Sequence, residues 1–140
     1  MSEYSFDADQ LETPAYVIDL GRLRRNLSIL DTVQKRADCR ILLALKGYAV
    51  HSTFDLIRAV LSGAAASSVA EASLARQFID KEVHAYAPAF SEADVTELLP
   101  LVDHVVFNSV SQLERFGGAF RAGPRSAELG LRINPEHRET

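Results

Sequence analysis

A lysine at the end of an apolar run is the residue of this sequence best suited to covalent chemistry. Lys46 follows the five apolar residues 41–45 and precedes Gly47. Unbroken apolarity predicts a strand buried on both faces, and Lys46 would then lie at its carboxyl end, where α/β folds place their sites. Burial of the side-chain stem would favour the uncharged amine, which is the form that Schiff-base chemistry needs. The competing interpretation is an ordinary strand-end lysine that reaches into water.

Glu71 and Arg132 are ionisable residues for which the sequence itself offers a structural role. Glu71 stands at the start of a predicted helix, where the helix dipole alone favours a carboxylate. Arg132 lies between Leu131 and Ile133 on a predicted buried strand, and a buried guanidinium needs a partner. The helix-start carboxylate and the ion pair are therefore structural interpretations that stand beside any binding role.

The remaining residues able to bind metals, phosphate or sulfur form no motif. The four histidines lack a ligand spacing such as H-x₃-H, so we predict structural or surface roles and no metal site. The single cysteine excludes an internal disulfide, and we expect an inert thiol. The glycine pair after residue 116 follows a predicted helix rather than a strand, so we expect a loop and not a phosphate-binding motif. These residues are His51, His84, His104, His137, Cys39, Gly117 and Gly118.

Strands and helices alternate along the chain with a period of about 20 residues. After a first short strand at 15–18, the apolar runs predict strands at 40–45, 64–69, 83–87, 104–107 and 128–133. Helical spacing predicts helices at 22–35, 52–61, 70–79, 91–99 and 109–116. Such βαβ units form either an open doubly wound sheet or part of a (β/α)₈ barrel, which needs about 250 residues. The periodicity alone leaves both architectures open.

Composition limits the partners that this chain can have. Of its 140 residues 47% are hydrophobic and 24% charged, which is sufficient for a globular core. A formal charge of −4 argues against a nucleic-acid partner. No apolar run approaches the roughly 18 residues of a membrane span, and the acidic start lacks the features of a secretory signal. With one cysteine, these properties predict a cytoplasmic protein.

Five short motifs stand in order along the chain: TPAYVID (13–19), LALK (43–46), ASSVAE (66–71), AYAPAF (85–90) and FNSVSQLE (107–114). Together they resemble the fold-type III, alanine-racemase-like family of decarboxylases that depend on pyridoxal 5'-phosphate (PLP). The resemblance extends from Thr13 to Glu136. It favours the carboxynorspermidine decarboxylase branch over the ornithine branch, because the alanines 64–66 stand where the ornithine enzymes carry an aspartate.

The resemblance implies a set of site residues and a reaction. Lys46 would bind PLP covalently from the first barrel strand, with Ala44, Glu71 and Arg132 also at the cofactor site. The implied reaction is the decarboxylation of carboxynorspermidine or carboxyspermidine to norspermidine or spermidine, in polyamine biosynthesis. The implied partners are this small polycationic substrate and, in full-length relatives, a second copy in a homodimer.

The resemblance also implies how the chain is organised. Residues 20–140 would form about five βα units of a PLP-binding (β/α)₈ barrel, and residues 1–19 would contribute the first strand of a β-domain. The family's ring-stacking histidine, glycine-rich phosphate loop and acidic partner of the pyridine nitrogen are expected beyond Thr140, so we expect the 140-residue chain to be inactive by itself. A non-catalytic PLP-binding barrel and a complete open-sheet binding module with a solvated Lys46 are the alternative interpretations.

Overall fold

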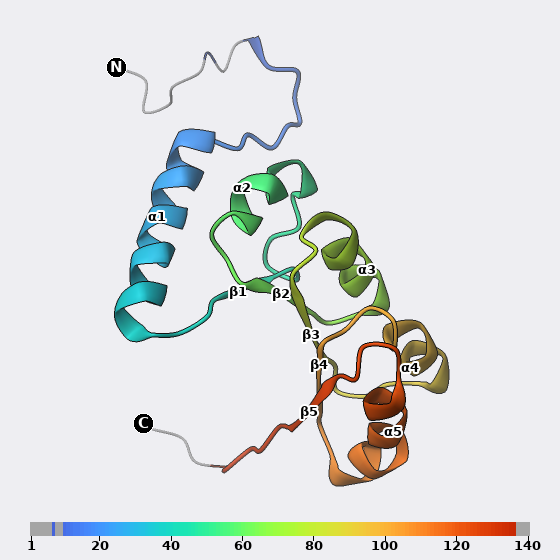
Figure 1. The fold of residues 1–140 in the computed structure, drawn as a ribbon. Helices are drawn as coiled ribbons and strands as arrows, with labels where there is room; N and C mark the ends of the chain where they lie inside the picture. The colour runs from blue at the N-terminus through green and yellow to red at the C-terminus, as the bar shows by residue number, and fades with distance from the viewer. Residues whose placement is uncertain (1–6, 8–9, 137–140) are drawn as a thin grey trace.

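A parallel five-stranded sheet forms the centre of the computed structural model, which describes residues 7 and 10–136 (Figure 1). The strands lie in chain order, and each pairs in parallel with the next. A doubly wound sheet reverses its strand order at a switch point, whereas a (β/α)₈ barrel adds its strands in sequence. The observed order therefore favours part of a barrel over the open doubly wound sheet. The strands are β1 (Leu42–Ala44), β2 (Gly63–Ala66), β3 (Glu82–Tyr86), β4 (His104–Phe107) and β5 (Glu128–Leu131).

Helices connect the strands, and α3, α4 and α5 lie on one side of the sheet (Figure 1). Polar residues begin most of them: the side chains of Asp19, Ser68, Ser91 and Ser109 each accept a hydrogen bond from a backbone N–H of the first turn. The helical segments are α1 (Leu20–Ala37), η2 (His51–Thr53), α2 (Phe54–Arg58), α3 (Val69–Phe78), α4 (Glu92–Leu98) and α5 (Val110–Ala122). Among the described residues, no helix has the length and apolarity needed to cross a membrane.

The core lies between the sheet and these helices. Along β3 and β4 fully buried residues alternate with half-buried ones, because successive side chains of a strand point to opposite faces. Val83, Val105 and Phe107 face the helices and are completely buried. The Phe107 ring makes edge contacts with Phe90 and Phe120, each with centroids 6.0 Å apart. One face of the sheet is therefore packed, and the other is left half-exposed.

The strand predicted at residues 15–18 does not form in the structure. These residues belong to no helix or strand, and Tyr16 is fully exposed. A strand needs a hydrogen-bonding neighbour, and none of the five described strands pairs with this segment. The division of the chain into residues 1–19 and 20–140 stays a prediction.

Helix boundaries also differ from the predictions, most clearly at α5 and at the start of the segment 51–58. The helix predicted to end at residue 116 continues as α5 through Gly117 and Gly118 to Ala122. A Cβ atom at Gly117 would lie 2.9 Å from Cδ1 of Leu129, so the glycine allows α5 to approach β5 closely. The helix predicted to start at a Ser52 cap begins instead as a 3₁₀ turn at His51, without a side-chain cap.

Candidate functional site

The carboxyl ends of the five strands gather polar side chains at one edge of the sheet. Lys46 lies just beyond β1, in a turn in which the N–H groups of Gly47 and Tyr48 donate to the Ala44 carbonyl at 2.9 and 3.1 Å. The preceding Leu45 is 3% exposed, and its N–H donates to the Ala65 carbonyl of β2. A buried leucine thus fixes the turn that presents the lysine.

Lys46 itself is exposed, as is Ala44, the last residue of β1. The predicted burial of the lysine in a strand end is therefore wrong, since β1 stops at Ala44 and the lysine follows in the turn. Among the described residues, no carboxylate or carbonyl pairs with its amine. The other two lysines are engaged, Lys35 with Asp31 at 2.6 Å and Lys81 with the Leu61 carbonyl at 2.7 Å.

Glu71 stands in the first turn of α3, beyond the end of β2. Its Oε2 accepts a hydrogen bond from the Ser67 N–H at 2.6 Å, while its own N–H donates to Ser68 Oγ at 3.2 Å. The second bond satisfies a donor that the helix start leaves unpaired, and the first ties the residue before the cap to the first turn of α3. The geometry gives Glu71 the structural role that the sequence offered as an alternative.

Arg132 follows β5 and joins a polar network over three strand ends. Its Nη1 donates to Oδ1 of Asn108 at 3.2 Å, and the Tyr86 hydroxyl donates to the same oxygen at 3.2 Å. The prediction of a buried Arg132 is wrong: the residue is exposed, and the neighbouring Ile133 is 79% exposed. Its partner is a neutral amide rather than a carboxylate. Motif spacing did not single out Tyr86 or Asn108, although both lie within the quoted motifs.

The predicted site residues are not brought into one cluster. Among the described residues, no hydrogen bond or ion pair joins Lys46, Glu71 and Arg132. Residues of the 66–71 and 85–90 motifs share a hollow of about 120 Å³ between the start of α3 and α4, well below the roughly 300–1,000 Å³ of typical ligand pockets. What the three predicted residues share is the carboxyl edge of the sheet, where barrel enzymes place their chemistry.

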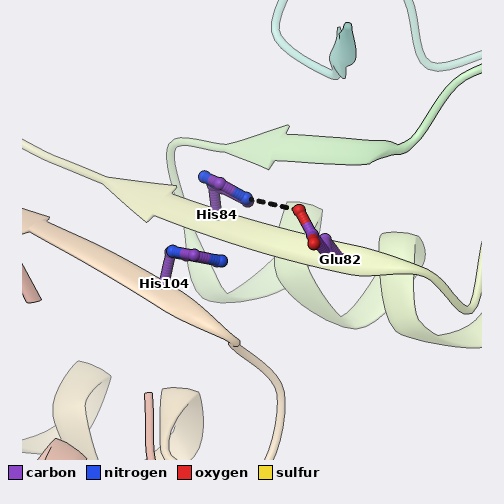
Figure 2. Close-up of side chains that lie close together, drawn as sticks. All are labelled: Glu82, His84 and His104. Atoms are coloured by element: carbon purple, nitrogen blue, oxygen red, sulfur yellow. Dashed lines mark hydrogen bonds and ion pairs between the residues drawn. The ribbon is translucent and has the colours of Figure 1, made fainter. Parts of the chain in front are cut away.

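Three residues that the sequence did not connect lie together on the half-exposed face of the sheet (Figure 2). His84 of β3 and His104 of β4 are register partners, with ring centroids 3.9 Å apart. Nε2 of His84 lies 3.3 Å from Oε2 of Glu82. A spacing of 20 residues, one βα unit, separates the two histidines and is the signal that could have paired them. Cys39 is exposed, and His137 lies outside the described residues.

Electrostatics hold the carboxylate of this cluster in its charged form. Burial raises the pKa of Glu82, but the hydrogen bond with His84 and the charge of Arg40 outweigh it and hold the pKa below its ordinary value. Arg40 contacts the other carboxylate oxygen, Oε1. The cluster therefore combines an ionised carboxylate with two imidazoles.

Comparison with known proteins gives the chain well-defined relatives, although no protein-family model matches it. It is 36% identical over 128 residues to a carboxynorspermidine/carboxyspermidine decarboxylase of Campylobacter jejuni, and 39% identical over 125 residues to one of Herminiimonas arsenicoxydans. It is 39% identical over 127 residues to a carboxyaminopropylagmatine decarboxylase of Synechocystis. These alignments cover 89–91% of this chain, which spans about a third of the relatives' length (32–33%).

Solved structures agree with the sequence comparison. The crystal structure of the Campylobacter jejuni carboxynorspermidine decarboxylase in complex with norspermidine superposes with a TM-score of 0.85 at 36% identity, over 91% of this chain and 34% of that one. A D-threonine aldolase from Filomicrobium marinum gives a TM-score of 0.77 at 20% identity, over 88% of this chain and 35% of that one, which establishes likeness of fold alone. Over about nine tenths of its length, the chain is thus similar to about one third of a carboxynorspermidine decarboxylase.

Proposed function

We propose that this chain forms the lysine-bearing part of a PLP-dependent decarboxylase that acts on carboxynorspermidine or carboxyspermidine. The observation that carries the proposal is the position of Lys46, an unpaired amine at the carboxyl end of β1, in a chain 36–39% identical to such decarboxylases. The proposed products are norspermidine or spermidine, and the proposed assembly of the longer protein is a homodimer.

The chemistry of the residues at the carboxyl edge fits PLP. The cofactor carries an aldehyde, which reacts with a primary amine, and Lys46 offers one that no described residue occupies. The cofactor is also anionic, and Arg132 supplies a cation at the same edge, exposed and bonded to a neutral amide. When bound, PLP supplies an electron sink for the electron pair that remains after loss of CO₂.

The chain's own residues would contribute binding and proton transfer. Lys46 would hold the cofactor covalently and, once displaced by the substrate amine, would be a nearby base and proton donor. Tyr86, Asn108 and Arg132 would line the edge that faces the reacting groups. The Tyr86 hydroxyl and the Arg132 guanidinium both donate to Oδ1 of Asn108, which holds them in place. We expect no turnover from these 140 residues alone, because they match only about a third of the length of the decarboxylases they resemble.

The test is site-selective labelling of the chain with PLP. PLP is added, the product is reduced with borohydride, and modified lysines are mapped by peptide mass spectrometry. With three lysines in the chain, we expect the label on Lys46 and its loss in Lys46→Ala, because Lys35 and Lys81 have intramolecular partners.

Lys35→Ala is the matched control and should leave the label on Lys46 unchanged. Equal labelling of all three lysines would contradict a dedicated cofactor lysine. In a chain of the relatives' full length, Lys46→Ala should also abolish CO₂ release from carboxynorspermidine.

A further inference from the structure

The cluster of Glu82, His84 and His104 shares a sheet face with Tyr86 but includes neither Lys46 nor Arg132. In the strand register, His104 of β4 pairs with His84 of β3, and His84 pairs with Ala65 of β2. Ala65 in turn pairs with Ala44, the last residue of β1, and the turn that carries Lys46 follows. Glu82 precedes His84 by two residues and so shares its face. All three side chains are 21–30% exposed in this chain.

The geometry of the three side chains brings potential metal ligands together. One nitrogen of each imidazole and one oxygen of Glu82 lie within 4.8 Å of one another. Figure 2 shows the two rings side by side, with one nitrogen of each directed toward the carboxylate. Around a tetrahedral Zn²⁺ with bonds of about 2.0–2.1 Å, ligand atoms lie roughly 3.4 Å apart. Small side-chain movements would therefore close the set around one ion.

Because the rings of His84 and His104 are stacked, they would have to rotate before both could bind one ion. The ring planes are nearly parallel, at 17°, whereas both lone pairs must meet at one point to share an ion. Rotation about the terminal torsion of each histidine achieves this, and that torsion has broad energy wells. A metal ion takes the lone pair of a neutral imidazole, so each of the two rings would offer one nitrogen to the ion.

Each of two ligands also has an outer partner of the kind that metal sites use. Nδ1 of His104 lies 3.5 Å from Oε2 of Glu128, which leaves Nε2 as the nitrogen available to an ion. A carboxylate on the second nitrogen of a ligating histidine fixes its orientation and raises its basicity. Arg40 holds Oε1 of Glu82, so Oε2 is the oxygen that would coordinate an ion, in place of its present 3.3 Å contact with Nε2 of His84. With neutral histidines the group carries two carboxylates against one guanidinium, a net charge that favours a cation.

We propose that Glu82, His84 and His104 form a binding site for a divalent transition-metal ion, with Zn²⁺ as the ion of best fit. Two imidazoles and one carboxylate are a recurrent Zn²⁺ set that leaves a fourth position open. The site draws on neither Lys46 nor Arg132, so the proposal stands or falls independently of the proposed decarboxylase function.

The test measures Zn²⁺ binding to the untagged 140-residue chain carrying Cys39→Ser, which removes the exposed thiol as a competing ligand. Zn²⁺ is titrated in competition with a chromophoric chelator, and Co²⁺ is used in parallel because its visible spectrum reports coordination by nitrogen and oxygen. We expect one Zn²⁺ per chain. Loss of an outer partner costs about 10–100-fold in affinity, so Glu128→Gln should weaken binding within that range, and His84→Gln or His104→Gln should weaken it further.

His51→Gln is the control, because His51 is exposed and lies outside the cluster. Far-UV circular dichroism checks that each variant is folded. The proposal is overturned if the chain fails to bind Zn²⁺ at micromolar concentration, or if the His84 and His104 variants bind it as the parent does. In either case the stacked pair serves only to hold β3 to β4.

Discussion

The two faces of the five-stranded sheet differ in what their side chains can do. The face toward the helices carries Ala64, Val83, Val105 and Phe107, all completely buried. The opposite face carries His84, Tyr86, His104 and Val106 at alternate positions of the same strands, all half-buried. Because strand side chains alternate, one short segment such as β4 contributes to both faces. The packed face stabilises the fold, and the half-exposed face is free to carry titratable groups.

Substitutions at adjacent positions of β4 test this difference most directly. Phe107→Ala should lower the free energy of unfolding by about 3–5 kcal/mol, because it leaves a cavity against Phe90 and Phe120. Val106→Ala removes two half-exposed methyl groups and should cost less than about 1 kcal/mol. Urea denaturation followed by far-UV circular dichroism measures both.

Phe107→Leu extends this test if the alanine variant does not fold, since leucine retains most of the buried area. Equal costs at positions 106 and 107 would contradict the division into a packed and an open face.

An ionic cluster at the amino ends of the strands should give the next largest effect. Asp103 precedes β4 and pairs with Arg76 at 2.7 Å and Arg125 at 2.6 Å, and it accepts the Val83 N–H at 2.9 Å. Burial raises the pKa of Asp103, but these three donors outweigh it and hold the pKa below its ordinary value. The carboxylate thus ties the amino ends of the strands to α3 and to the segment before β5.

Asp103→Asn should lower the free energy of unfolding at pH 7 by roughly 2–3 kcal/mol, because two guanidinium groups lose a charged acceptor. Since the folded pKa is depressed, the stabilisation is complete above the unfolded value of about 3.9 and is lost as the pH falls through the folded pKa. The difference between variant and parent should therefore shrink in acid. Asp55→Asn is the control, since Asp55 pairs with Arg58 on the surface and its side chain is 86% exposed; an equal loss there would contradict the argument.

Local sequence signals predicted much of the fold. The strand at 104–107 has the predicted bounds, and Asp19 caps α1 as expected. The cap depends on neighbouring residues alone, and the strand also has pairing partners on both sides, β3 and β5. The strand predicted at 15–18 is not among the described strands, because apolar composition supplies no pairing partner; its assignment to a β-domain stays a prediction.

The candidate site was harder to predict, for reasons of register and exposure. The apolar run before Lys46 predicted burial, but β1 ends at Ala44 at the sheet's edge, and the lysine is exposed. The pairing of His84 with His104 depends on the register of two strands joined through α4, which short-range spacing rules for metal ligands do not cover. Arg132 had the predicted need for a partner, and the structure supplies Asn108 rather than an acid.

The glycine pair of α5 gives the smallest effect and tests how tight the packed face is. Gly118 faces open space, so Gly118→Ala should raise the free energy of unfolding by about 0.5–1 kcal/mol through helix propensity alone. Gly117→Ala offers the same backbone gain, but its Cβ would lie 2.9 Å from Leu129, which must shift. Urea denaturation of both variants should therefore give a smaller gain, or a loss, at position 117. Equal gains would mean that α5 and β5 have room for a methyl group at position 117. Close packing against β5 would then not be the reason for a glycine at that position.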